Sequence, residues 1–299
     1  MPIDERDMKK DVNCNTKNSD YKLNHVNRST NDTISNLTHD QLLKSDLFVQ
    51  ASKIQCNNIR ISTGADSLDK MIGGGLETKT ITQFYGQPGS CKTQLCFTLC
   101  ALLPSNFKCI FIDTEGTFRL ERIQEISRAR KVNALLENIF VSRAYTTTEL
   151  ENCMDNTEKK IDSDPVIKLL IIDSMTNLYR IEYSGAARLS QRQHQFTKYM
   201  YKIKNLAESR DIVVVITNQV YLDYSSSHDK DKAVGGYSLN YPCTNIIKLI
   251  KNRDIEITAK LLKSPFYKNN MTYLLISEGG IIDDEIDNKR IEEIEKRKI

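Results

Sequence analysis

A glycine-containing loop between a predicted strand and a predicted helix has the composition of a phosphate-binding site. The segment is Tyr85-Gly86-Gln87-Pro88-Gly89-Ser90-Cys91-Lys92-Thr93-Gln94. In such a loop, backbone N–H groups at a helix N-terminus surround a polyphosphate, the Lys92 ammonium reaches the β and γ oxygens, and the Thr93 hydroxyl binds Mg²⁺. An ordinary strand–turn–helix without a nucleotide is the alternative.

Cys91 occupies a position where the strict pattern, G-x-x-x-x-G-K-[ST], has glycine. Because glycine supplies backbone freedom there, we expect a Cβ at this position to cost about 1 kcal/mol or more of strain. The same Cβ would crowd the phosphates. The substitution therefore favours slow turnover of a bound nucleotide.

Two other predicted strands end in carboxylates. The apolar run Val166–Ile172 is followed by Asp173, which would complete the shell of Mg²⁺ through water. The run Lys108–Ile112 is followed by two acids, Asp113 and Glu115. A carboxylate at the carboxyl end of a strand is placed to polarise water for attack on a γ-phosphate. Together with the loop, these acids predict a site for ATP and Mg²⁺.

The elements that must position these residues alternate along the chain. Short β-rich runs, several of them apolar throughout, predict strands buried on both faces at Thr80–Tyr85, Lys108–Ile112, Ile139–Ser142, Val166–Ile172 and Ile212–Thr217. Longer helical patterns lie between them at Lys92–Leu103, Leu120–Arg130, Thr147–Ile161 and Ala187–Ser209. This alternation predicts an α/β fold with a parallel sheet and crossover helices.

The pattern changes after about residue 243. Apolar and polar residues alternate over 255–261, and a Lys-Asn-Arg-Asp turn separates this run from Asn245–Ile250. Together they predict an antiparallel hairpin at the edge of the sheet. Met271–Ile276 predicts one further strand.

Composition narrows the class of protein. The 299 residues carry 42 Lys and Arg against 39 Asp and Glu, a net charge of +3, which excludes a histone-like polycation and leaves nucleic-acid contacts to local patches. No apolar run approaches about 18 residues and the N-terminus has no apolar core segment, so we expect neither a membrane span nor a secretory signal. The 8 cysteines form no C-x-x-C pair, which argues against a zinc site and favours free thiols in a reducing cytoplasm.

The chain divides into four predicted segments. Residues 1–40 are rich in asparagine and in charged residues, bury too little apolar surface to offset their ordering entropy, and are predicted to be disordered. Residues 41–57 are predicted to form a short helix and a linker. Residues 58–284 are predicted to form the globular core, and residues 285–299 a charged terminal helix.

The core resembles the RecA/RadA recombinase superfamily over roughly residues 58–284. The resemblance rests on segments in the family's order and near its spacing: Ser62-Thr63-Gly64-Ala65-Asp66-Ser67-Leu68-Asp69, Gly73-Gly74-Gly75-Leu76-Glu77-Thr78, Ile112-Asp113-Thr114-Glu115-Gly116-Thr117-Phe118-Arg119-Leu120-Glu121-Arg122, Leu178-Tyr179-Arg180-Ile181-Glu182-Tyr183-Ser184-Gly185, Ile216-Thr217-Asn218-Gln219-Val220-Tyr221 and Val234-Gly235-Gly236. It implies a RecA-type P-loop ATPase core, in which a mostly parallel twisted sheet has flanking helices and an antiparallel C-terminal edge hairpin.

The resemblance also implies roles for the matching residues. Glu115 would be the catalytic carboxylate, Lys92 would act on the phosphates, and Gln219 would sense the γ-phosphate and pass its state to the loop that follows. Thr93 and Asp173 would hold Mg²⁺. The remaining contacts to ATP would come from Gly86, Gln87, Pro88, Gly89, Ser90, Cys91 and Gln94, with Arg122 stacked on the adenine.

Two DNA-binding loops are implied at about Tyr183–Arg192 and Tyr221–Val234. Aromatic residues that stack on bases, together with cations that bind phosphates, suit single-stranded DNA. The candidate contacts are Tyr183, Arg188, Arg192, Tyr221, Lys230 and Lys232. Double-stranded DNA is a second candidate ligand, and solvated surface loops without DNA are the alternative.

Three departures from the family pattern shift the resemblance towards RadB, the archaeal paralogue of RadA, whose members assist recombination rather than drive strand exchange. The family's helix-hairpin-helix N-terminal domain is not recognisable in the sequence. A Gly-Arg-Gly-like segment is replaced by Gly185-Ala186-Ala187, which loses a basic residue. Ala233 replaces the proline that precedes Val-Gly-Gly in recombinases.

A possible docking segment, Phe48-Val49-Gln50-Ala51, matches the F-x-x-A pattern by which recombinases bind a neighbouring ATPase core. Phe48 would be an aromatic anchor and Ala51 a small residue, and the segment would add a strand to a sheet edge. The implied partners are further copies of this chain or a RadA-type recombinase. A short amphipathic helix packed on its own domain explains the segment equally well.

These patterns favour an ATP-dependent DNA-binding protein of homologous recombination and DNA repair, specifically a RadB-like paralogue that assists a recombinase. The first alternative is a RadA-type recombinase that forms filaments on single-stranded DNA. The second is an ATPase with a RecA-type core that does not act on DNA.

Overall fold

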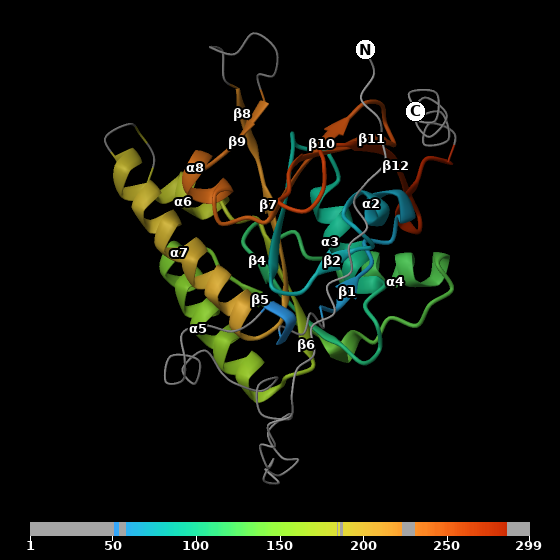
Figure 1. The fold of residues 1–299 in the computed structure, drawn as a ribbon, viewed down its shortest axis with the longest axis horizontal. Helices are drawn as coiled ribbons and strands as arrows, with labels where there is room; N and C mark the ends of the chain where they lie inside the picture. Colours follow the sequence, from blue (N-terminus) through green and yellow to red (C-terminus); the bar gives the residue numbers. More distant parts are fainter. Residues whose placement is uncertain (1–50, 54–57, 184, 186–187, 223–230, 286–299) are drawn as a thin grey trace, which may run out of the picture. The chain divides into compact units, whose positions relative to one another are not determined.

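The computed structural model describes residues 51–53, 58–183, 185, 188–222 and 231–285 (Figure 1). The chain divides into the units Met1–Gln55 and Cys56–Ile299. In the first unit, the described part is the 3₁₀ helix η1 (Ala51–Lys53). The predicted disordered segment 1–40, most of the predicted helix and linker at residues 41–57, and nearly all of the terminal helix 285–299 lie outside the described residues. The four predicted segments therefore remain predictions.

Within the described residues, nine strands of the second unit form one mixed sheet. Their spatial order is β13 (Gly280–Asp283), β12 (Met271–Ser277), β11 (Glu256–Lys263), β10 (Asn245–Lys251), β3 (Thr80–Tyr85), β7 (Val213–Asn218), β6 (Ile167–Asp173), β4 (Lys108–Asp113) and β5 (Ile139–Arg143). The strands from β10 to β5 pair in parallel, and those from β10 to β13 pair antiparallel. The predicted α/β class with a mostly parallel sheet is therefore confirmed.

Helices cover both faces of the sheet (Figure 1). One apolar cluster joins α2 (Asp66–Met71), α3 (Lys92–Ala101) and α4 (Leu120–Ala129) to the sheet. The other joins α5 (Thr147–Ser163), α6 (Asn177–Glu182), α7 (Leu189–Ser209) and α8 (Gly236–Asn240). Every residue of β3 and β7 is buried. This double-sided burial explains the apolar run Val213–Ile216 in β7, whereas β3 buries three polar side chains as well, those of Thr80, Thr82 and Gln83.

The predicted hairpin forms, but it does not lie at the edge of the sheet. β10 and β11 pair antiparallel as expected, with Leu249 opposite Ala259. β12 then pairs with β11, and β13 pairs with β12 and forms the edge. The sequence analysis missed β13 because it has four residues and begins only three residues after the end of β12, too short a run to show a period.

Short elements complete the described part. Two small antiparallel ribbons pair β1 (Arg60–Ile61) with β2 (Leu76–Glu77), and β8 (Val220–Leu222) with β9 (Asp231–Ala233). A second 3₁₀ helix, η2 (Leu136–Asn138), precedes β5. None of these was predicted. The helix predicted from Ala187 begins at Leu189.

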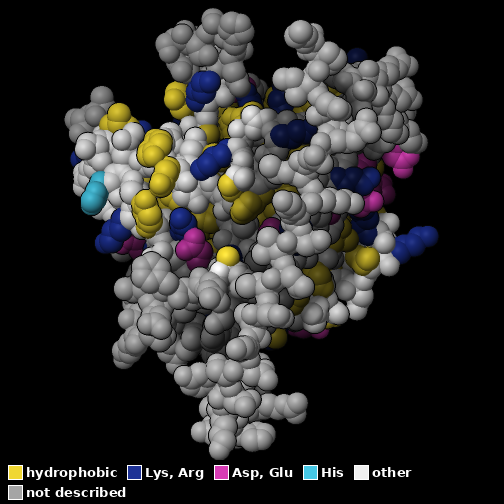
Figure 2. Space-filling model, viewed as in Figure 1, with side chains coloured by type: hydrophobic (Ala, Val, Ile, Leu, Met, Phe, Trp, Pro, Cys, Tyr) yellow, Lys and Arg dark blue, Asp and Glu magenta, His cyan; other side chains and the backbone are white. Residues whose placement is uncertain are grey.

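No helix in the described part of the chain is long and apolar enough to cross a membrane. Figure 2 shows hydrophobic side chains gathered over the part of this face formed by α7 and α8. Exposed tyrosines of this region are Tyr201, Tyr237 and Tyr241. The rings of Tyr237 and Tyr241 stack with centroids 5.1 Å apart, so part of their apolar area is shielded from water.

Candidate nucleotide-binding site

The glycine-containing loop connects β3 to α3, and the side chain of Lys92 closes it. The Lys92 Nζ donates to the carbonyl oxygens of Gly86 and Gln87, each at 2.9 Å, and to the Ser90 Oγ at 3.4 Å. At Gly86 an added Cβ would lie 2.2 Å from the carbonyl oxygen of Leu249, so only glycine fits there. Burial lowers the pKa of Lys92, while the carboxylates of Asp173 and Glu115 oppose this shift. The loop is therefore closed around an ammonium that is partly removed from water.

Cys91 adopts the left-handed backbone conformation that its position predicts. Its φ is 72° and its ψ 17°, and it is the N-cap residue of α3. A non-glycine residue in this region costs about 1–2 kcal/mol, so the expected strain is present. The side chain is buried in the apolar cluster on α3, where burial raises the pKa of the thiol to about 11 against the opposing charges of Lys251 and Lys92. Cys91 is therefore a buried neutral thiol in a strained position.

Thr93 and Asp173 meet at the carboxyl edge of the sheet. The Thr93 Oγ1 donates to the Asp173 Oδ2 at 2.8 Å, and the Thr217 Oγ1 donates to the other oxygen of the same carboxylate. Asp173 is 2% exposed, and this burial raises its pKa against the effect of the two hydroxyl donors.

These oxygens fit Mg²⁺ bound together with a nucleotide. Mg²⁺ in such sites takes one or two carboxylates, with substrate phosphates and water as its other ligands. No group of three or more His, Cys, Asp or Glu among the described residues could hold a metal ion on its own. Thr93 and Asp173 supply only part of the oxygen ligands that Mg²⁺ needs, and the phosphate oxygens of a bound nucleotide would supply others.

The structure separates the roles of the two acids that follow β4. The buried Asp113 carboxylate accepts three backbone N–H groups, from Glu115, Thr117 and Phe118, each at 3.1 Å. It therefore fixes the turn. Glu115 is exposed, and its Oε1 accepts the Ser174 hydroxyl at 2.6 Å and the Gln219 Nε2 at 3.1 Å. Of the two, Glu115 is the one free to act on a solvent molecule.

Gln219 connects Glu115 to a residue that sequence reasoning did not assign. The Arg180 guanidinium on α6 donates to the Gln219 Oε1 at 2.5 Å. Ser174, the other partner of Glu115, was also missed, although it directly follows Asp173. Arg180 lies within a quoted motif and Ser174 beside a predicted site residue, but nothing in the spacing indicates that their side chains meet Gln219 and Glu115.

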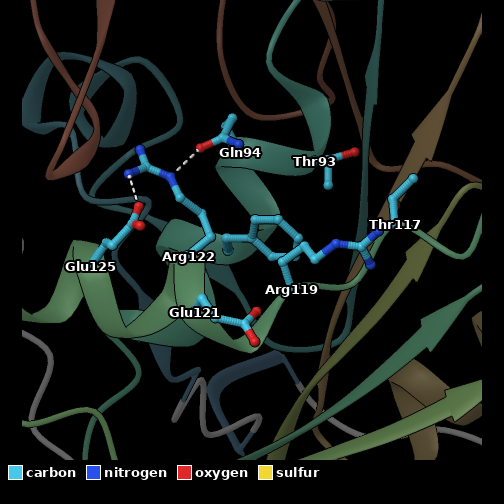
Figure 3. A pocket seen from close by; sticks show the side chains of 8 residues that line it. Thr93, Gln94, Thr117, Arg119, Glu121, Arg122 and Glu125 are labelled. Atoms are coloured by element: carbon cyan, nitrogen blue, oxygen red, sulfur yellow. Dashed lines mark hydrogen bonds and ion pairs between the residues drawn. The ribbon is translucent and has the colours of Figure 1, made fainter.

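A cavity of about 520 Å³ lies next to Thr93, between α3 and α4 (Figure 3). Arg122 lines it, and its Nε donates to the Gln94 Oε1 at 2.9 Å while one NH2 group donates to the carbonyl oxygen of Ser277 at 2.7 Å. Arg122 is thereby held between two helices and the end of β12. The Arg122 side chain therefore forms part of the wall of a cavity beside the loop. Stacking of Arg122 on adenine stays a prediction.

The residues predicted to contact DNA occupy two places. Tyr183 ends α6, and Arg188 and Arg192 stand at the start of α7. On the second ribbon, Tyr221 pairs directly with Lys232 and is 47% exposed. Lys230 lies outside the described residues, as does Phe48 of the docking segment. Ala51 is exposed in η1.

Comparison with known proteins adds a family and two relatives. The sequence profile of the Rad51 family matches residues 54–284. Two proteins named meiotic recombination protein DMC1 homolog A, from Oryza sativa subsp. japonica and Oryza sativa subsp. indica, are each 36% identical to this chain over 251 residues. Each alignment spans 80% of this chain and 72% of the relative. The range 54–284 that matches the family profile includes all elements from β1 to β13 and therefore the whole candidate site.

Proposed function

The chain belongs to the Rad51 family, and on that premise we propose that it binds DNA in an ATP-dependent way during homologous recombination and DNA repair. As a member of this family, it is an ATPase. One observation carries the proposal: Lys92, the Thr93–Asp173 pair and Glu115 all stand at the carboxyl edge of the parallel strands β3, β6 and β4. Ligands of open α/β sheets bind at this edge.

In the proposed site, the loop residues Gly86–Gln94 bind the triphosphate. The backbone N–H groups at the N-terminus of α3 face the phosphates, and Lys92 exchanges its carbonyl partners for phosphate oxygens. Thr93 and Asp173 would hold Mg²⁺, which supplies positive charge against the phosphate oxygens when it is bound. Arg122, at the wall of the adjoining cavity, would contact the base.

Glu115 is the proposed general base for hydrolysis. Its carboxylate orients a water molecule in line with the γ-phosphate and takes up a proton from it. In the arrangement seen here, the Ser174 hydroxyl and the Gln219 amide both occupy the Glu115 Oε1. This contact supports a role for Gln219 as the sensor of the γ-phosphate, since a move of its amide towards phosphate would release Glu115.

Single-stranded DNA is the proposed nucleic-acid ligand, with double-stranded DNA as the alternative. Tyr221 and Lys232 lie side by side across the ribbon β8–β9, so one ring and one cation can meet a base and a phosphate of the same strand. Arg188 and Arg192 at the start of α7 would add phosphate contacts.

Two finer proposals concern the role in recombination. A RadB-like paralogue that assists a recombinase is supported by the strained Cys91 in the phosphate loop and by the loss of a basic residue at Gly185-Ala186-Ala187. A strand-exchange recombinase is supported by the 36% identity to a meiotic recombination protein over 80% of this chain. Assembly with further copies or with a RadA-type recombinase, through Phe48 and Ala51, belongs to either proposal.

Turnover and particle size together test the proposal. We expect Lys92→Ala to abolish binding of a fluorescent ATP analogue, and Glu115→Gln to lower kcat by about 100-fold or more with the affinity for the analogue unchanged. Glu137→Gln, an exposed acid on η2, is the matched control and should behave as wild type. Unchanged kcat in Glu115→Gln would contradict the assigned base.

The same assay separates the two finer proposals. Turnover that rises strongly with single-stranded DNA, together with large assemblies in light scattering, supports the recombinase. Low turnover with a small particle supports the assisting paralogue. Absence of any DNA binding would contradict both.

A further inference from the structure

The side chain of Gln87 links the phosphate loop to the strand β9. Its Nε2 donates to the Asp231 Oδ2 at 2.8 Å, and Asp231 is the first residue of β9. The backbone carbonyl of the same Gln87 accepts the Lys92 Nζ at 2.9 Å. One residue of the loop therefore contacts both the phosphate-binding lysine and the strand that closes the second predicted DNA-binding loop.

Lys248 contacts both the carboxylate and the backbone carbonyl of Asp231. Its Nζ lies 3.4 Å from the carbonyl oxygen of Asp231 and 3.9 Å from the Asp231 Oδ2. Lys248 is 5% exposed, and a buried ammonium of this kind requires an opposite charge close by. In the parallel pairing of β10 with β3, Lys248 stands opposite Tyr85, the residue immediately before Gly86. The cluster is therefore anchored in the sheet beside the start of the phosphate loop.

The donors of Lys92 are fully used in this arrangement. An ammonium has three N–H donors, and those of Lys92 have three acceptors: the carbonyl oxygens of Gly86 and Gln87, and the Ser90 Oγ. Lys92 cannot donate to a phosphate without giving up at least one of them. If the contact given up is the one to the Gln87 carbonyl, the residue whose side chain is bonded to β9 loses its link to Lys92.

We propose that Gln87 is a positioning residue that transmits the engagement of Lys92 with phosphate to β9, through an Asp231 carboxylate held by Lys248. This inference rests on the proposed function. The route differs from the one through Gln219, since it starts at the loop rather than at the γ-phosphate and uses none of the contacts of Glu115. A separate connection to the nucleotide site lies directly after β9, where the Val234 N–H donates to the Gln219 carbonyl oxygen at 3.0 Å.

Hydrogen exchange of the ribbon β8–β9 tests the route without DNA. In the wild-type protein, we expect a non-hydrolysable ATP analogue with Mg²⁺ to change the exchange of the β9 amides. In Gln87→Met, which keeps the length of the side chain but has no amide, this change should be lost at a concentration of the analogue that saturates both proteins, so that a difference in affinity does not affect the comparison. Lys248→Met should have the same effect on β9. Gln193→Met, an exposed glutamine on α7, is the matched control.

Coupling to DNA gives a second readout. The dissociation constant for single-stranded DNA with the analogue, divided by that without it, measures the coupling between the two ligands. We expect this ratio to move at least about fivefold towards one in Gln87→Met and in Lys248→Met. A change of about fivefold is the smallest coupling factor that is usual between two ligand sites. If the wild-type β9 does not respond to nucleotide, or if Gln87→Met responds as the wild type does, the inference is wrong. A wild-type protein that binds no DNA would instead overturn the proposed function, and hydrogen exchange would still decide the route.

Discussion

Cys91 stands at the N-terminus of α3 with a φ of 72°, where most phosphate loops have glycine. Cys91→Gly should therefore raise the free energy of unfolding by about 1 kcal/mol. The substitution relieves the strain of the left-handed residue, and the larger conformational entropy that glycine loses on folding offsets part of this gain. For a chain of this size this corresponds to a rise in Tm of about 2–4 °C in thermal denaturation.

Cys91→Ala is the matched control for this substitution, since it removes the sulfur but keeps the Cβ that causes the strain. It should melt no higher than the wild-type protein. Equal gains in the alanine and glycine variants would mean that the buried thiol, rather than the backbone, destabilises the loop.

Asp173 gives a second prediction at the residue scale, because burial raises its pKa above its ordinary value of 3.8. The ionised carboxylate costs folding free energy above the folded-state pKa, and this cost disappears below 3.8, where both states are protonated. Without nucleotide, Asp173→Asn should therefore melt higher than the wild-type protein at pH 8, and the difference should shrink as pH falls. Its turnover should drop by about 100-fold or more, since the carboxylate is lost from the proposed Mg²⁺ site.

Asp164 is the control of opposite sign, because a hydrogen bond from Lys108 lowers its pKa. Its ionised form stabilises the fold above its ordinary pKa of 3.8, and this stability is lost as pH falls through the lowered value. Asp164→Asn should accordingly melt lower than wild type at pH 8 and match it in acid. If both asparagine variants shift Tm in the same direction at pH 8, the assignment for Asp173 fails.

Among the elements, α8 depends on one side chain of β11. The Lys263 Nζ donates to the carbonyl oxygens of Asn240, Tyr241 and Cys243 at 2.9, 3.0 and 2.8 Å, where α8 ends. The last carbonyl groups of a helix have no partners within it. Lys263→Met leaves these three oxygens without their ammonium and should lower the free energy of unfolding by about 1–3 kcal/mol in urea denaturation.

Lys260→Met, on the same strand, is the matched control and should change stability by less than about 0.5 kcal/mol. Lys263→Arg should recover part of the loss, because a guanidinium also donates to several carbonyls. A loss of the same size in both methionine variants would indicate that charge on β11, rather than the end of α8, determines the effect.

The elements also show what the sequence can predict. β4, β6 and β7 are buried on both faces, so their apolar runs define them to within one or two residues. α6 and α8 have six residues or fewer and each strand of the ribbon β8–β9 has three, which is too short for a hydrophobic period to show. In the candidate site, too, the sequence shows local motifs but not contacts between distant segments. Motifs identify Lys92 and Glu115, whereas the contacts of Arg180 with Gln219 and of Gln87 with Asp231 arise only when distant segments meet.

For the whole molecule, the sheet offers an edge at which a second chain could assemble. β5 lies at one end of the described sheet, and its Val141 is 42% exposed. An added strand with an aromatic anchor suits such an edge. If Phe48 is that anchor, Phe48→Glu should reduce the particle in light scattering to a single chain while the affinity for ATP stays unchanged.

Val49→Glu provides the control, because Val49 lies between the two anchor positions of the F-x-x-A pattern. It should leave the particle size as in the wild-type protein. A Phe48→Glu particle of wild-type size would show that the segment does not mediate assembly.

The place of β3 in the sheet also affects how the chain folds as it is made. The residues of β3 come early in the sequence, but the strand lies between β7 and β10. The hydrogen bond from the Ile81 N–H to the Thr244 hydroxyl, just before β10, joins residues that are 163 positions apart. At ordinary rates of translation, of about 5–20 residues per second, the ribosome needs on the order of 10–30 s to deliver that partner. During this interval a nascent chain would expose the unpaired side of its central strand, the situation in which chaperones usually protect a polypeptide.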